Sequence, residues 1–233
     1  MPTSISIKSV TATVQMSLYH VNVISSLSIS IAAVIGAIRY KKVSSDFYPF
    51  IYLLWIGLAS ELLCLVIALY FKNNIVIGNI YVLIESLFLL WQFSNWMNYK
   101  SGKRKYLLIG ILFFAIWLTD NLLMHDITRI NSFFRVSYSF IIVFLSMEQI
   151  NLVFLSERDN VLKNATFLLC AAFIVFFVFK ALFEVFYMIN VRMSDNFYHT
   201  LFLILVIVNF FTNLIFAIAV LWIPKKLKFT LPL

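Results

Sequence analysis

Five charged side chains lie inside the long apolar runs of this 233-residue chain. A charge at the centre of a lipid bilayer costs at least about 2.5–3.5 kcal/mol, so it needs a partner, a proton or a water-filled cavity. In membrane proteins such residues mark substrate and ion pathways, proton relays or binding sites. The five residues are therefore the first candidates for a solute-binding or ion-binding site: Glu61, Glu85, Glu148, Lys180 and Glu184.

Depth within the apolar runs selects three of the five. Glu61, Glu85 and Lys180 all lie close to the middle of their runs. Glu184 lies one helical turn beyond Lys180 in the same run. Glu148 lies about 6 Å from the centre of its run, calculated from the helical rise of about 1.5 Å per residue. We expect Lys180 to oppose Glu61, Glu85 or both. Two alternatives remain open, a purely structural salt-bridge network and a local pair between Lys180 and Glu184.

Polar residues in the other runs follow the helical period, which predicts a polar interior. Asn209 and Asn213 share one face of the last run and join the candidate binding residues. Small and polar strips mark helix faces turned away from lipid. We expect the first, second, third, sixth and seventh spans to enclose this interior.

The composition agrees with a chain that lives in lipid. It is 63% hydrophobic and 12% charged, against roughly 45–50% and about 25% in soluble domains. Its mean hydropathy is +0.96. An integral, multi-pass membrane protein follows, and collagen-like or disordered chains are excluded.

The apolar runs are about twenty residues long and continuous, which predicts helices because each segment must satisfy its own backbone hydrogen bonds. The fold class is an all-α, seven-transmembrane-helix bundle. One membrane domain, 17–223, follows a short tail, 1–16, and precedes a basic tail, 224–233. The predicted helices are 17–38, 50–71, 75–97, 106–124, 133–155, 166–190 and 198–223.

The basic residues predict the orientation. Twelve of the 18 Lys and Arg fall on the side of the bundle that carries the C-terminus. Cytoplasmic loops carry an excess of Lys and Arg, so the N-terminus is predicted outside and the C-terminus in the cytoplasm. The net charge of +8 thus reports topology and lipid contact. Nucleic acid is excluded as a partner because the short loops form no basic surface.

Spans recur at a shift of 117 residues, with four identities in one turn, such as Tyr70 with Tyr187 and Asn73 with Asn190. This spacing suggests two parallel three-helix repeats joined by the fourth helix. Such a plan resembles the SWEET sugar porters and the PnuC vitamin carriers in architecture alone. No span has an internal proline, so the proline signature of the former is missing.

Histidines form a second candidate site at the outer ends of three spans. Three imidazoles and a carboxylate could hold Zn²⁺ with an open position for water. That set, His20, His125, His199 and Asp126, resembles the adiponectin-receptor and alkaline-ceramidase superfamily, which pairs two His in its last helix. Only His199 is present there, so we predict no metal or other cofactor and keep zinc as the alternative.

Three functions follow from these patterns. The first is a small-solute or proton/ion-coupled carrier or channel of the cytoplasmic membrane, with a site at the bilayer midplane. The second is a seven-helix sensor or non-catalytic subunit, with a membrane-protein partner or a second copy of the chain. The third is a metal-dependent hydrolase. Retinal binding is disfavoured because the last span contains no Lys, and the lack of HExxH, GxSxG and Walker sequences favours a non-enzyme.

Overall fold

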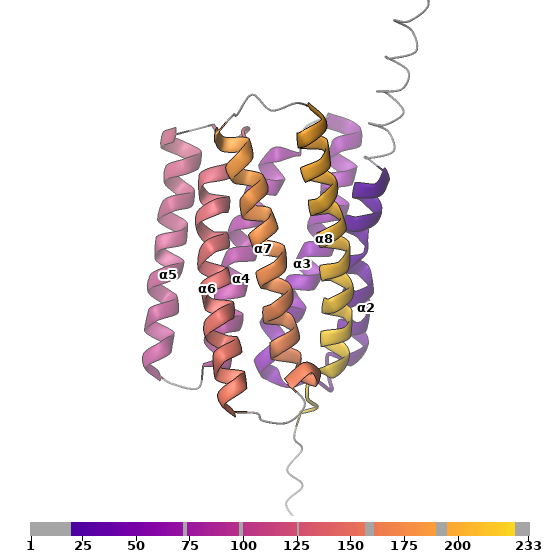
Figure 1. Cartoon of the computed structure of the whole chain (residues 1–233), viewed down its shortest axis with the longest axis vertical. Coiled ribbons are helices and arrows are strands. Elements are labelled where there is room, and N and C mark those ends of the chain that lie inside the picture. The colour runs from indigo at the N-terminus through magenta and orange to yellow at the C-terminus, as the bar shows by residue number, and fades with distance from the viewer. Residues whose placement is uncertain are drawn as a thin grey trace, which may run out of the picture.

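The structure, a computed structural model, describes residues 20–71, 74–97, 100–124, 126–156, 161–189 and 195–226. Seven helices among these residues are long and apolar enough to cross a membrane, which confirms the predicted number. Figure 1 shows them side by side with roughly parallel axes. Within the described ranges there is no strand, although an isolated bridge joins Val43 and Lys225. The fold is therefore an all-helical, multi-pass membrane bundle.

The helix bounds follow the apolar runs. The first span is His20–Arg39, and its second part is α2 (Ile29–Arg39). The remaining spans contain α3 (Tyr48–Phe71), α4 (Ile75–Trp96), α5 (Lys100–Thr119), α6 (Ser132–Ser156), α7 (Ala165–Ile189) and α8 (Asp195–Trp222). Three short elements extend or connect them: η1 (Ser45–Phe47), the π turn η2 (Asp120–Met124) and η3 (Val161–Lys163).

Three helices begin two or more residues before the start that hydropathy predicts: α3 at Tyr48, α5 at Lys100 and α8 at Asp195. Helix α3 starts at Tyr48 and has Pro49 in its first turn. Proline is tolerated there because the N–H groups of a first turn have no helical partner in any case. Buried Gln92 of α4 fixes this start, since its Oε1 accepts the Phe50 N–H at 2.9 Å and its Nε2 donates to the Asp46 carbonyl at 2.7 Å. Helix α5 starts at Lys100, among basic residues whose long stems can reach the lipid headgroups.

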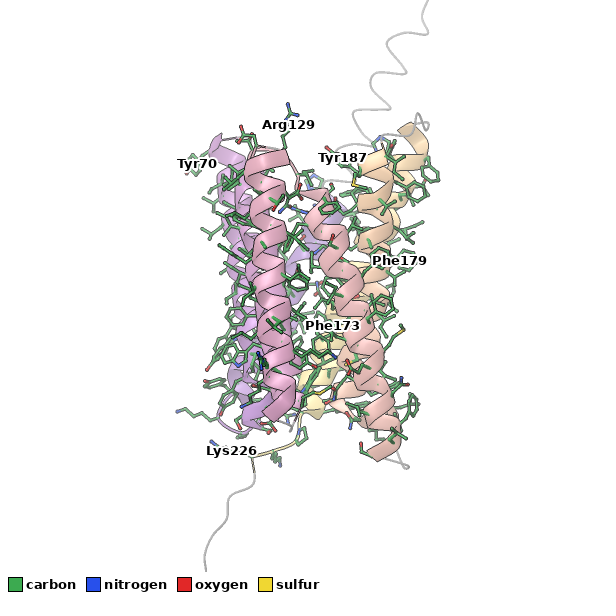
Figure 2. All side chains as sticks on the ribbon, turned by 90° about the vertical axis from the view of Figure 1, so that its left-hand side faces the viewer. Tyr70, Arg129, Phe173, Phe179, Tyr187 and Lys226 are labelled. Carbon is green, nitrogen blue, oxygen red and sulfur yellow. The ribbon has the colours of Figure 1, made fainter. Side chains whose placement is uncertain are left out.

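The helices form a ring in chain order. Each span contacts the next, and the first span contacts α8, which closes the ring. Helix α4 also contacts α6, so α5 lies outside the interior, at one edge of the bundle in Figure 1. Large apolar side chains cover the outer surface, as Figure 2 shows, and these face the lipid. The interior is consequently bounded by the other six spans.

Four phenylalanines fill the interior toward the end of the bundle that carries Lys226. We call Phe50, Phe93, Phe173 and Phe216 the aromatic plug. Their ring centroids lie 5.2 to 6.2 Å apart, and the first three side chains are at most 2% exposed. Edge-to-face packing at these distances is favourable. The plug therefore fills the interior on the Lys226 side with packed rings.

Backbone and side-chain hydrogen bonds close the ring at this same end. Arg39 donates to the carbonyl oxygens of Leu221 and Ile223, the latter at 3.2 Å, where α8 ends. The Lys226 N–H donates to the Lys42 carbonyl at 2.8 Å. A cation suits the C-terminal end of a helix, whose last carbonyls lack helical partners. Arg39 thus joins the first span to the last.

We expect Arg39→Ala to lower the free energy of unfolding by about 1.5–3 kcal/mol, because two carbonyls lose a charged donor. Thermal unfolding of the purified protein in detergent measures this. Lys41→Ala is the matched control, since Lys41 is exposed and has no described partner. Equal melting temperatures for the two variants would contradict the assigned role of Arg39.

Candidate functional site

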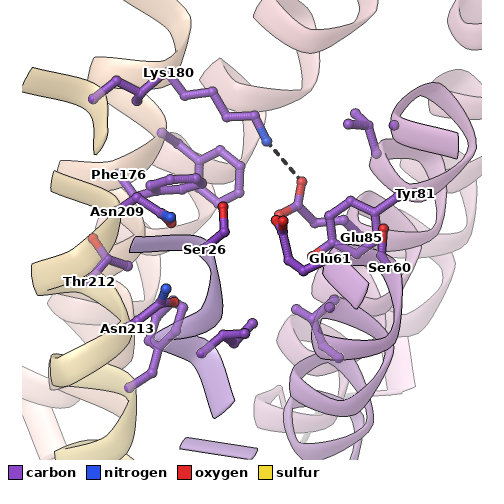
Figure 3. Close-up of a pocket in the computed structure, with 18 of the residues that line it drawn as sticks. Ser26, Ser60, Glu61, Tyr81, Glu85, Phe176, Lys180, Asn209, Thr212 and Asn213 are labelled. Atoms are coloured by element: carbon purple, nitrogen blue, oxygen red, sulfur yellow. Dashed lines mark hydrogen bonds and ion pairs between the residues drawn. The ribbon is translucent and has the colours of Figure 1, made fainter. Parts of the chain in front are cut away.

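A cavity of about 380 Å³ lies in the middle of the bundle. Its wall comes from the first span, α3, α4, α7 and α8, with Arg135 contributed by α6. These include the five spans expected to enclose a polar interior. Figure 3 shows Glu61, Glu85 and Tyr81 on one side and Phe176, Asn209 and Asn213 on the other. Polar and aromatic side chains therefore line the same cavity.

Lys180 and Glu85 form a buried ion pair across this cavity. The Lys180 Nζ lies 3.0 Å from Glu85 Oε2, and the two side chains are only 12% and 11% exposed. Tyr138 of α6 donates from its hydroxyl to the same Oε2 at 2.7 Å and accepts a hydrogen bond from Lys180. The tyrosine is fully buried. One tyrosine thus ties the acid of α4 to the base of α7.

Aromatic rings surround the Lys180 ammonium. The Nζ lies 5.2 Å from the centroid of Tyr138 and 5.3 Å from those of Phe176 and Phe177. A cation within about 6 Å of a ring centroid is attracted by the negative face of the ring. The rings therefore replace part of the hydration that the ammonium loses on burial.

Glu61 lines the same cavity without a basic partner. Of the described Lys, Arg and His side chains, none forms an ion pair with it. Its hydrogen-bond partner is Ser26 of the first span, which faces it in Figure 3. Gly57, one turn earlier on α3, leaves the room into which Ile29 and Tyr81 pack. Of the three acids on the described cavity wall, Glu61 is thus the one without an ion-pair partner.

Glu184 belongs to a second network at the other end of the cavity from the plug. Its Oε1 lies 3.3 Å from Arg135 Nη1, and its Oε2 accepts from Ser132 Oγ at 2.6 Å. Arg135 also donates to Asn131 Oδ1 at 2.9 Å and to Asn79 Oδ1 at 3.3 Å. The local pairing of Lys180 with Glu184, left open by the sequence, is therefore not formed.

Glu148 lies away from the cavity. It pairs with Lys105 of α5 at 2.8 Å, and both side chains are more than 40% exposed. The structure thus places Glu148 in a surface pair between α5 and α6, apart from the other candidate acids.

Asn209 and Asn213 lie on the cavity wall and hold α8 against the first span. Asn209 Nδ2 donates to Ser25 Oγ at 3.2 Å, and Asn213 Nδ2 donates to Ser28 Oγ at 2.9 Å and to the Ser25 carbonyl at 3.3 Å. Ser25 Oγ donates in turn to the Val206 carbonyl at 2.7 Å. No described group donates to the side-chain oxygen of either asparagine, so both oxygens remain as acceptors.

The histidine set is not assembled by the described residues. His20 and His199 are exposed at their helix ends, and His125 lies outside the described residues. Asp126 accepts from the Thr128 N–H at 3.4 Å, as in a turn. Among the residues that the structure describes, no group of three His, Cys, Asp or Glu could hold a metal ion. Nearby Asp120, fully buried, caps α6 by accepting from the Phe134 N–H at 2.8 Å.

Sequence reasoning missed Tyr138 and Arg135. Arg135 stands near the start of an apolar run, where a basic residue indicates orientation, and a tyrosine in an apolar run carries no charge to draw attention. A signal existed, because Ser132, Arg135 and Tyr138 are spaced by three residues and so share a face of α6. That face turns toward Glu85 and Glu184.

Comparison with known proteins gives no relative for this chain: no family model, no curated protein and no solved structure matches it. Function must therefore be argued from the site itself.

The charged groups on the described cavity wall do not balance, because there is one more acid than there are bases. Three carboxylates, Glu61, Glu85 and Glu184, face two cations, Lys180 and Arg135. Each cation is already paired with a different acid. With every group in its usual charge state, the surplus charge is that of Glu61.

We expect Lys180→Met to lower the free energy of unfolding by about 3–5 kcal/mol, because it leaves Glu85 buried and unpaired. Adding Glu85→Gln should recover most of that loss, since the double variant buries no lone charge. Unfolding in mixed detergent micelles measures the free energies of the unsubstituted protein, Lys180→Met and the double variant.

The exposed pair Lys105 and Glu148 supplies the control. Lys105→Met should change stability by at most about 1 kcal/mol, as surface ion pairs do. A double variant Glu85→Gln/Lys180→Met as unstable as Lys180→Met alone would contradict the pairing.

Proposed function

We propose that this chain is a small-solute or proton/ion-coupled carrier or channel whose binding site lies at the bilayer midplane. The observation that carries the proposal is Glu61, an acid without a cationic partner on the wall of a central cavity. Glu61 lies near the middle of α3, and Glu85 near the middle of α4. A carboxylate at that depth is retained where a proton, an ion or a solute reaches it.

The remaining wall supports the same proposal. Clefts for small molecules measure about 300–1,000 Å³ and combine apolar walls with a few polar groups that fix orientation. The cavity, at about 380 Å³, falls in this range and has such walls. Its aromatic plug separates it from the Lys226 end of the bundle. A carrier needs such a seal on one side at a time, because a continuous aqueous path would dissipate gradients.

The proposal includes a chain with its N-terminus outside, its C-terminus in the cytoplasm and a location in the cytoplasmic membrane. Described basic residues gather at the end that carries Lys226, while Tyr70, Arg129 and Tyr187 mark the opposite end in Figure 2. Cytoplasmic segments are the ones enriched in Lys and Arg.

The proposed repeat has support from helix bounds. Helices α3 and α7 begin 117 residues apart, at Tyr48 and Ala165, and the first span and α6 end 117 residues apart, at Arg39 and Ser156. In each triplet the middle helix contacts both of its neighbours. Two parallel units joined by α5 would account for both observations.

The flux test uses the full chain in sealed vesicles with an entrapped pH-sensitive dye and an imposed potassium diffusion potential. We expect proton flux above that of empty vesicles, and Glu61→Gln should reduce it roughly ten-fold or more, equivalent to about 1.4 kcal/mol. Glu148→Gln is the matched control, because it removes the same charge from the surface pair.

Unchanged flux in Glu61→Gln would count against the site. If proton flux is absent, amine and sugar uptake is measured in the same vesicles, and the absence of every flux would contradict the carrier.

The orientation test uses single cysteines in a Cys64→Ala/Cys170→Ala background. In intact cells, an impermeant maleimide should label Arg129→Cys and should reach Lys41→Cys only after the cells are permeabilised. The reverse pattern would invert the proposed topology.

A sensor or non-catalytic subunit is the second candidate, and one observation favours it. Four of the five charged groups on the cavity wall are locked in ion pairs, as a structural network would be. In that case neutralising Lys180 lowers stability without removing a flux, and a second protein co-purifies with the chain.

A further inference from the structure

We propose that the cavity binds a small protonated amine with an apolar body, and that Glu61 receives its ammonium group. The proposal deepens the carrier function by naming the class of solute, and it rests on that function for the movement of the amine across the membrane. Binding of the amine does not depend on its transport, so each is measured by its own experiment.

The sign of the ligand follows from the surplus charge. Lys180 and Arg135 each have a carboxylate within ion-pair distance, so neither is free to receive an anion. Glu61 has the Ser26 hydroxyl as its hydrogen-bond partner, and the charge of Lys180, which is paired with Glu85, acts on it from outside ion-pair distance. A cation that enters the cavity balances the wall, whereas an anion would add a second uncompensated charge in a low-dielectric interior.

Aromatic rings at the cavity already surround one ammonium group, that of Lys180. The Lys180 Nζ already lies within 5.3 Å of the ring centroids of Tyr138, Phe176 and Phe177. Phe176 also lines the cavity and stands opposite Glu61 in Figure 3. A ligand ammonium placed between Phe176 and Glu61 gains both a ring face and a carboxylate. The same wall offers rings to an apolar body, namely Phe183, Phe202 and Phe216.

Free acceptor oxygens favour a nitrogen that carries N–H groups. The amide nitrogens of Asn209 and Asn213 point to Ser25 and Ser28, and this leaves their oxygens for the cavity. A primary ammonium has three N–H donors. The Glu61 carboxylate can accept from such a group, and the asparagine oxygens are further acceptors on the wall, whereas a quaternary ammonium has no N–H to donate.

The size and polarity of the cavity disfavour an inorganic ion as the only ligand. A water molecule takes about 30 Å³ of liquid volume, and this cavity measures about 380 Å³. Hard cations require several oxygen ligands around them, whereas most of this wall is aromatic and aliphatic. An organic cation fills the apolar space that an ion would leave empty.

The experiment measures binding of 2-phenylethylamine to the full chain in detergent, by calorimetry and by the shift of the melting temperature. The neutral analogue 2-phenylethanol and the anion phenylacetate share its ring and differ in charge. We expect saturable binding of the amine alone, weakened about ten-fold or more in Glu61→Gln and unchanged in Glu148→Gln.

Two further variants keep the test decisive if Glu61→Gln does not fold. Glu61→Asp retains the charge and should retain weaker binding, and Phe176→Leu retains an apolar side chain while it removes the ring and should also weaken binding. Equal binding of amine and alcohol, or amine binding that ignores both Glu61 and Phe176, would overturn the proposal.

The outcomes separate this proposal from the carrier function. Glu61-dependent amine binding without any flux in vesicles leaves the amine site standing and contradicts the carrier. Proton flux that depends on Glu61, with no amine binding, leaves the carrier standing and overturns the amine site.

Discussion

The buried ion pair between Lys180 and Glu85 is the interaction on which the interior of this bundle depends. Each charge alone would be costly in the middle of an apolar bundle, by at least about 2.5–3.5 kcal/mol on insertion scales. Together, at 3.0 Å and with Tyr138 bound to both, they are satisfied. Because the three residues lie on α4, α6 and α7, one polar contact fixes the relative rotation of three helices whose outer faces are uniformly apolar. Lipid contact alone could not specify that rotation.

The polar contacts divide the cavity wall into two parts of different strength. Helices α4, α6 and α7 are held by charged contacts, through Lys180 and Glu85 and through Arg135 with Glu184. The first span and α8 are held to each other by neutral hydrogen bonds among Ser25, Ser28 and the two asparagines. Glu61 of α3 stands where these two parts face each other.

Much of the bundle could be predicted from the sequence, because hydropathy directly reports which residues contact lipid. Depth along each run also placed Glu61, Glu85 and Lys180 at one level, since the rise per residue of a helix is fixed. The rotation of each helix about its own axis could not be predicted in this way. Glu148 and Tyr138 both belong to α6, yet one faces Lys105 at the surface and the other faces Glu85 in the interior. The choice between Glu85 and Glu184 as partner for Lys180 likewise depends on how α4 and α6 are turned, which only packing determines.

The two ends of the cavity differ in polarity. Phe50, Phe93 and Phe173 are almost completely buried, so packed rings occupy the interior on the Lys226 side. At the other end Arg135 and Glu184 face the cavity and carry both charge signs. In the proposed carrier, a proton or a solute that moves toward the plug would displace rings, whereas one that moves toward Arg135 would meet hydrogen-bonding groups. In the proposed carrier, passage past the plug would displace rings that α3, α4, α7 and α8 supply. Helix α3 carries both Glu61 and Phe50, so the proposed binding site and the plug share one helix, and in the proposed carrier a change at one would reach the other along it.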